Sequence, residues 1–134
     1  MRLLLSILIL LSFILFAGSC KKHHCDPQPS IIGKWELRKQ SGGILGGQTD
    51  YPPGNGAIYK FTSSNFESYL NGLLVNNGTY HFAKDTFQTG QILDVLVLNG
   101  QSSNENRFIQ IEENRFTFLD NFADGFNRMY ERIQ

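Results

Sequence analysis

The chain has 134 residues, with 12 Lys plus Arg against 12 Asp plus Glu, so its formal net charge at pH 7 is zero. This balance excludes the extended basic surface that nucleic-acid binding requires, and it leaves no polybasic patch for anionic lipid. Aromatic residues make up 13% of the chain, including 11 Phe. A chain of this length forms one domain, and so many large apolar side chains can fill its core without disulfide staples.

The N-terminus has the pattern of an exported protein. Arg2 precedes an apolar run over residues 3–16, and the small residues Ala17-Gly18-Ser19 follow it. The run is shorter than the about 20 residues that a membrane span needs, and it fits the apolar region of a secretory signal. Cys20 stands directly after the small residues.

This order of residues resembles the lipobox of bacterial lipoproteins. The resemblance implies that a signal peptide, residues 1–19, is removed and that Cys20 is acylated, which anchors the mature chain to a membrane outside the cytoplasm. The alternative is an ordinary secretory signal with an incidental cysteine nearby. Because basic Lys21 and Lys22 follow Cys20, the resemblance implies the outer membrane, on its periplasmic side rather than at the cell surface.

The mature chain divides into a lipidated tether, residues 20–30, and one domain, residues 31–134. The sequence holds two cysteines, Cys20 and Cys25. Acylation of Cys20 would leave Cys25 as a free thiol or as the partner of another molecule. The tether also carries His23 and His24, but so short a segment imposes no closed ligand geometry, so we expect no metal site and no cofactor.

After Ser30 the sequence predicts short strands and no helix. Segments that alternate aromatic with polar or β-branched residues are separated by Asn-Gly pairs and Gly-rich punctuation. Asn71-Gly72 predicts a two-residue type I′ hairpin, since both positions need positive φ. Asn76-Asn77-Gly78 predicts a second turn or a bulge. The expected strands cover residues 33–40, 57–62, 65–70, 73–83, 92–98, 107–112, 115–119 and 126–133.

Eight strands joined mostly by hairpins predict an all-β fold, an eight-stranded antiparallel up-and-down barrel. The connections are too short for parallel crossovers, and barrel closure removes exposed sheet edges. A two-sheet sandwich is the alternative. Residues 41–56 are rich in Gly and Pro, and we expect them to form one long loop, either a lid over a binding site or a surface insertion.

Gly33-Lys34-Trp35 at the start of the first strand resembles the opening motif of the lipocalins and wider calycins. In that family an arginine of the last strand packs across the tryptophan ring, and Arg132 stands at the matching place. The chain further resembles the short lipocalin-like lipoproteins of Gram-negative bacteria. The segments that carry this resemblance are residues 33–37, 50–54, 59–62, 71–72, 78–80 and 124–125.

The sequence offers no catalytic constellation. It has no Gly-x-Ser-x-Gly elbow, His81 stands alone on a strand, and Glu112-Glu113 fall at a hairpin corner. We therefore do not expect an enzyme. Asp94 interrupts an apolar strand, and we expect it to face outward rather than toward a polar spot inside the barrel.

An eight-stranded barrel can be filled by side chains or admit one small molecule. The candidate ligand-lining residues are aromatics at alternating strand positions, with Tyr51 as a contact from the long loop. These side chains could equally be the core of a filled barrel. The set comprises Tyr51, Tyr59, Phe61, Phe66, Tyr80, Phe82, Phe116 and Phe118.

Two functions follow from this pattern. The first is a monomeric, membrane-anchored barrel that binds a small hydrophobic molecule in the cell envelope. The second is a protein-interaction or inhibitor module whose barrel core is filled.

Replacing the expected lipidation site tests the anchor. Cys20→Ala removes the thiol that would carry acyl chains, and two or more such chains hold a protein on a membrane where one does not. We expect the variant to move from the membrane fraction to the soluble fraction in cell fractionation, while Cys25→Ala stays membrane-bound. Retention of the Cys20 variant on the membrane would exclude the lipobox.

Overall fold

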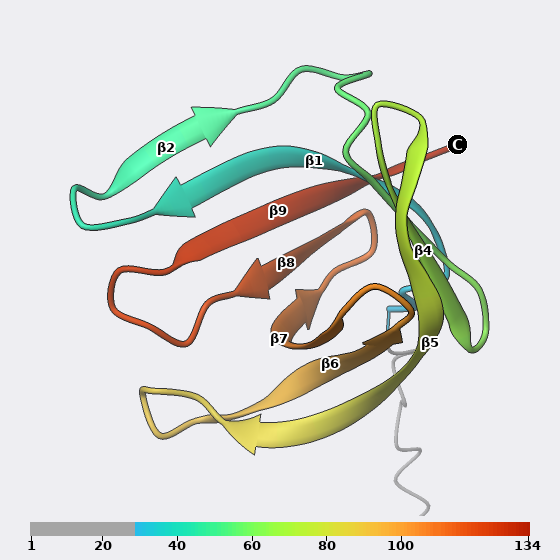
Figure 1. Ribbon diagram of the computed structural model, residues 1–134. Helices are drawn as coiled ribbons and strands as arrows, with labels where there is room; N and C mark the ends of the chain where they lie inside the picture. Colours follow the sequence, from blue (N-terminus) through green and yellow to red (C-terminus); the bar gives the residue numbers. More distant parts are fainter. Residues whose placement is uncertain (1–28) are drawn as a thin grey trace, which may run out of the picture.

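The computed structural model describes residues 29–134, apart from the side chain of Asn104. The predicted signal peptide and Cys20 lie outside the described residues. Within residues 29–134, no helix has the length and apolar character of a membrane span. The strands (Figure 1) are β1 Gly33–Gly42, β2 Gly47–Asp50, β3 Ile58–Phe61, β4 Asn65–Leu70, β5 Leu73–Thr86, β6 Ile92–Gly100, β7 Asn104–Ile111, β8 Arg115–Leu119 and β9 Phe126–Ile133.

The strands form one antiparallel sheet that closes on itself. Its order is β2-β1-β3-β4-β5-β6-β7-β8-β9, and β9 returns to pair with β1, with Trp35 opposite Arg132. All strands except β2 thus make a closed eight-stranded antiparallel barrel, as the sequence predicts. From β3 to β9 each strand pairs with the next along the chain, so hairpin connections suffice there, and the β1–β9 pairing closes the barrel.

Local turn chemistry sets the register of β4 and β5. Asn71 has φ of 52° and Gly72 has φ of 79°, which confirms the tight hairpin with two left-handed positions. Tyr69 pairs with Leu74 and Ser68 pairs with Asn76, so one extra residue of β5 bulges between them. The prediction of a turn or bulge at residues 76–78 is therefore wrong, because these residues pair in regular register with β4 and the bulge lies just before them, at Val75.

The prediction of one long loop over residues 41–56 is wrong in its first half. β1 continues to Gly42, and β2 pairs back on it, with Lys39 opposite Asp50. The glycines that suggested a loop supply the turn between the two strands, where Gly43 and Gly46 have positive φ. Residues 41–50 are therefore a β-hairpin that extends the barrel wall.

The second half of this segment is held to the outer side of β1 by Glu36. The carboxylate accepts hydrogen bonds from the backbone N–H of Gly54 at 3.1 Å and of Gly56 at 3.2 Å, and it pairs with Arg38. Burial alone would raise the pKa of Glu36, but the bonds from Arg38, Gly54 and Gly56 outweigh burial and hold this pKa below its usual range. Residues 51–57 are therefore pinned and do not form a free lid.

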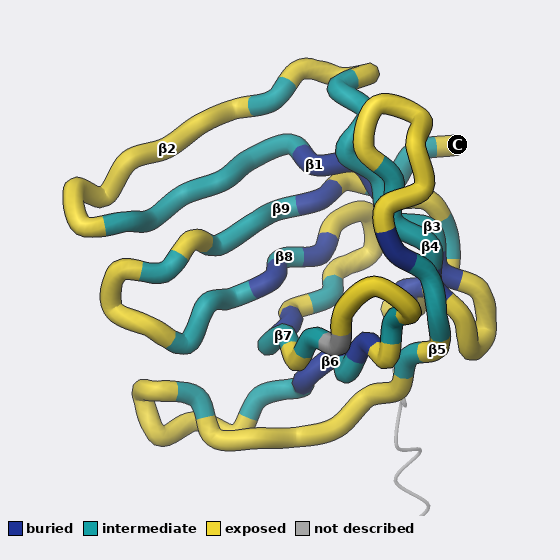
Figure 2. Tube along the Cα trace, in the orientation of Figure 1, coloured by how far each residue is buried: buried dark blue, intermediate teal, exposed yellow. Residues whose placement is uncertain are grey.

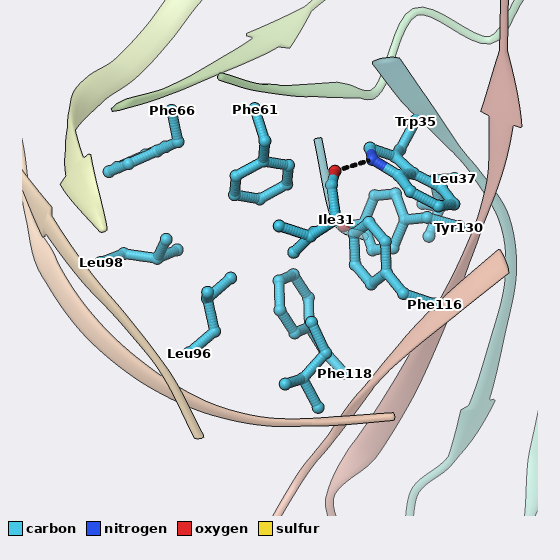
Figure 3. Close-up of a cluster of buried hydrophobic side chains, with 11 residues drawn as sticks. Ile31, Trp35, Leu37, Phe61, Phe66, Leu96, Leu98, Phe116, Phe118 and Tyr130 are labelled. Atoms are coloured by element: carbon cyan, nitrogen blue, oxygen red, sulfur yellow. Dashed lines mark hydrogen bonds between the residues drawn. The ribbon is translucent and has the colours of Figure 1, made fainter. Parts of the chain in front are cut away.

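Large apolar side chains from β1, β3, β4, β6, β8 and β9 fill the barrel (Figure 3), and Figure 2 marks the buried residues along the chain. The rings pack edge-on or stacked, with Trp35 5.1 Å from Phe116 and Phe116 4.8 Å from Tyr130 between centroids. Such pairs add about 0.5–1.5 kcal/mol each to the burial of the rings. The most fully buried side chains are Trp35, Phe61, Phe66, Leu96, Leu98 and Phe116.

One end of the barrel is closed around Trp35. Its indole N–H donates to the Ile31 carbonyl at 2.6 Å (Figure 3), and the Arg132 guanidinium lies 4.1 Å from the ring centroid. Arg132 also donates to the carbonyls of Ile32 and Ser30, at 2.7 and 2.8 Å. A Cβ at Gly33 would collide with this guanidinium, which explains the glycine of the Gly-x-Trp triplet.

Truncation of Trp35 tests the closed end. We expect Trp35→Ala to lower the free energy of unfolding by about 3–5 kcal/mol, because a large ring leaves a cavity in the core. Chemical denaturation measures the change, with Ile44→Ala, at a side chain 84% exposed, as the control that shifts stability by less than about 0.5 kcal/mol. A loss below about 1 kcal/mol for the Trp35 variant would contradict this packing.

The depressed pKa of Glu36 predicts a pH dependence of stability. A folded-state pKa below the usual 4.5 contributes stability at neutral pH that is lost as the pH falls through that folded-state value. Glu36→Gln should lower stability at pH 7 by about 1–3 kcal/mol, since it weakens buried hydrogen bonds. Its unfolding free energy should also decline less steeply than that of the wild type below pH 4.5. Glu113→Gln, in an exposed turn, is the control, and parallel acid profiles for wild type and Glu36→Gln would refute the role of Glu36.

Candidate functional site in the barrel mouth

The structure distributes the predicted ligand-lining aromatics over different environments. Tyr51 packs on the core from residues 51–57, and the Tyr80 hydroxyl donates to the Thr62 carbonyl at 2.6 Å. Phe82 is 46% exposed. Four of the set are at most 4% exposed and fill the closed end, namely Phe61, Phe66, Phe116 and Phe118.

Tyr59 and Tyr130 lie at the edge of this packed core. Their ring centroids are 5.4 Å apart, and Tyr59 also lies 5.7 Å from Phe118. Neither hydroxyl has a hydrogen-bond partner among the described residues, where every fully buried side-chain nitrogen and oxygen is partnered. Both hydroxyl oxygens therefore reach solvent, although the Tyr130 side chain is only 6% exposed.

Charged side chains of β7 and β9 face the same interior. Arg107 pairs across the sheet with Leu96, and Glu105 pairs with Leu98. Directly opposed residues share a face, and both leucines are buried in the core, so Arg107 and Glu105 point inward. By the same argument Arg128, opposite Phe118, points inward from β9.

We call Gln40, Tyr59, Glu105, Arg107, Arg128 and Tyr130 the mouth cluster. Arg107 donates through Nε to Glu105 Oε2 at 2.9 Å, and its Nη2 forms an ion pair with the same oxygen at 2.9 Å. Arg128 donates through Nε to Gln40 Oε1 at 3.4 Å, and no carboxylate of residues 29–134 lies within 4.0 Å of it. The cluster thus contains one neutralised and one uncompensated guanidinium.

Electrostatic coupling connects these groups across the barrel. Burial raises the pKa of Tyr59 and Tyr130; the Glu105 carboxylate adds to the rise, whereas Arg107 and Arg128 oppose it. Burial would lower the pKa of Arg107, but the Glu105 carboxylate outweighs burial and raises it. At neutral pH the site therefore presents two neutral phenol hydroxyls beside two cations.

Asp120, beyond the end of β8, also bears on the charge of the mouth. Its negative charge helps to raise the pKa of Arg107. Its carboxylate accepts a hydrogen bond from the Phe126 N–H at 3.1 Å, and its own N–H donates to Asn127. Asp120 is thus bound into the β8–β9 loop and leaves Arg128 without an ion-pair partner.

A hollow lies where the chain enters the barrel. It has a volume of about 430 Å³ and is bounded by residues 29–32 and by Phe82, Lys84 and Asp94. Lys84 and Asp94 form an ion pair at 2.9 Å. The expectation that Asp94 faces outward is wrong, because alternation puts it on the face of buried Leu96, and Lys84 supplies its charge partner.

The described part of the chain holds no group of three or more His, Cys, Asp or Glu side chains suited to a metal ion. Comparisons with protein-family models, with curated proteins and with solved structures found no match to this chain. The fold is a closed eight-stranded barrel whose inward face carries polar and charged side chains next to an aromatic core.

Sequence reasoning identified Tyr59 in this cluster but missed Arg107, Arg128 and Tyr130. A signal for β9 was present, because Tyr130 and Arg128 alternate in a strand whose bounds were predicted. Arg107 points inward because it pairs with buried Leu96 of β6. The sequence of β7 alone does not show which residue of β6 it pairs with.

Proposed function

We propose that this chain is a lipid-anchored envelope protein of lipocalin-like design that binds a small, mainly apolar molecule in its barrel mouth. The observation that carries this proposal is the pair of inward tyrosine hydroxyls, on Tyr59 and Tyr130, that reach solvent without a protein partner. Ligand sites in barrels are concave and largely apolar, with a few polar groups that orient the ligand. An aromatic floor beneath a few unused donors fits this description.

The proposed address comes from the sequence. Acylation of Cys20 would attach the tether to the periplasmic side of the outer membrane, and the domain would begin about ten residues later. The Trp35–Arg132 contact, which the lipocalin resemblance implies, supports a lipocalin-like design. A barrel held next to a bilayer would exchange apolar molecules with it over a short distance.

A mouth-filling variant tests ligand binding. N-phenyl-1-naphthylamine, a neutral apolar probe, should bind the mature protein saturably with a gain in fluorescence. Gln40→Trp places an indole beside Arg128 and should weaken probe binding by about tenfold, which is about 1.4 kcal/mol. Gln48→Trp, on exposed β2, is the matched control and should bind like the wild type.

Native mass spectrometry of the mature protein from its own envelope complements this titration. We expect a co-purifying small molecule in the wild type that is depleted in Gln40→Trp. If no molecule co-purifies and the probe gives no saturable signal, the binding proposal fails.

The second candidate is a protein-interaction module, and the β4–β5 hairpin favours it. Four apolar side chains that flank its turn are more than half exposed, namely Leu70, Leu73, Leu74 and Val75. Exposed apolar patches of this kind mark contact sites for other molecules. A complex with a second protein that Leu73→Ser and Leu74→Ser abolish, without loss of probe binding, would support this function.

A further inference from the structure

We propose that this chain forms a symmetric dimer in which the outer edge of β5 pairs with the same edge of a second copy. The proposal goes beyond ligand binding and replaces the monomer that the sequence suggests. It starts from the length of β5, which pairs with β4 only as far as Thr79 but continues along β6 to Thr86. In Figure 1 this part of β5, drawn in yellow, forms the lower border of the barrel.

The alternation of the strand identifies the backbone groups on this edge. The Tyr80 N–H donates to the Ser64 carbonyl at 3.0 Å, so the backbone of Tyr80 is directed toward the β4 side. Residues two apart on a strand direct their groups to the same side, so Phe82 and Lys84 present N–H and C=O there. These groups have no backbone partner on that side within residues 29–134. All residues from 81 to 86 are exposed, and such an edge is a template for another strand.

A second copy fits this edge better than the preceding part of the same chain does. The segment Asp26-Pro27-Gln28-Pro29 contains two prolines, which lack the N–H that a paired strand donates. A second β5 offers an exposed run of equal length without proline, over residues 81–86. Pairing two copies of this edge would satisfy the same backbone groups in both.

A twofold axis through Ala83 brings the free backbone groups together. Antiparallel pairing about this axis sets Phe82 opposite Lys84 of the second copy, and both residues direct their groups to the shared edge. Each such pair would exchange both N–H···O bonds, as hydrogen-bonded pairs of an antiparallel ladder do. Ala83 would meet its own copy at a non-hydrogen-bonded position, where the Cα atoms are about 4.5 Å apart and a small side chain fits.

The side chains are complementary in this register. On one face His81 lies opposite Asp85 of the second copy, so an imidazole N–H can donate to a carboxylate. On the other face the aliphatic stem of Lys84 lies beside the Phe82 ring, which is 46% exposed in the single chain. These contacts occur twice, once on each side of the axis.

Neighbouring registers are less favourable. An axis at Lys84 would set two like charges directly opposite each other, which is destabilising. An axis at Phe82 would bring Tyr80 into the new pairing, although its N–H is already bound to Ser64. The charges of this edge therefore favour one alignment of two copies.

Cysteine cross-linking tests the axis. Ala83→Cys is introduced into the full chain together with Cys25→Ser, and the membranes that contain the protein are oxidised with copper phenanthroline. We expect a disulfide-linked dimer, because Cα atoms about 4.5 Å apart satisfy disulfide geometry. Lys84→Cys should link far less, since its copies lie more than about 7 Å apart in this register. Gln48→Cys, on exposed β2, measures random collisions.

A swap of the facing side chains separates pairing from folding. Asp85→His sets two imidazoles opposite each other and should weaken the dimer about fivefold, measured by native mass spectrometry of the mature protein over a concentration series. Adding His81→Asp restores the pair in reversed order and should return the wild-type affinity. Both variants should keep the wild-type circular dichroism spectrum, because both side chains are exposed.

Several outcomes would overturn the dimer. A protein that stays monomeric at every concentration and gives no Ala83→Cys link in membranes would do so. A link stronger at Lys84→Cys than at Ala83→Cys would overturn the axis, and so would failure of the His81–Asp85 swap to restore affinity. A link from Ala83→Cys to a different protein would assign the edge to another partner. Each of these results leaves the proposed ligand binding intact, because probe binding is measured independently.

Discussion

The structure depends on the closure of one barrel end around Trp35. A buried indole N–H needs an acceptor, and the Ile31 carbonyl supplies it at 2.6 Å. Arg132 covers the ring and binds the carbonyls of Ser30 and Ile32. These contacts join the first and last strands and draw the entering chain across the barrel end. The closed end therefore follows from a few polar contacts made around one apolar ring.

This closure determines where a ligand can lie. An eight-stranded barrel has an interior just wide enough for side chains or one small molecule. Phe61, Phe66, Phe116 and Phe118 occupy the closed end, so a ligand inside the barrel would have to lie beyond Tyr59 and Tyr130. The high aromatic content that suggested a pocket thus provides its floor, and the polar groups of β7 and β9 provide its walls.

The features that the sequence predicts are those that local chemistry determines. Asn71-Gly72 forms its turn because both residues tolerate positive φ, and β8 and β9 have the predicted bounds because short turns flank them. The loop over residues 41–56 was mispredicted in its first half because β2 is exposed and rich in polar residues, and it becomes a strand only by pairing with the extended end of β1. Charged residues on strands usually face solvent, so the inward arginines became visible only through their register against buried leucines.

The same register explains why the mouth carries an unbalanced charge. β7 places Glu105 two residues from Arg107, so the two share a face and neutralise each other within one strand. On β9 the inward neighbours of Arg128 are Tyr130 and Phe126, and across the sheet it meets Phe118 and Gln40, none of which is acidic. Burial keeps both tyrosines neutral by raising the pKa of each. Among the described residues Arg128 therefore has no ion-pair partner within 4.0 Å, and Gln40 is the side chain to which it donates a hydrogen bond.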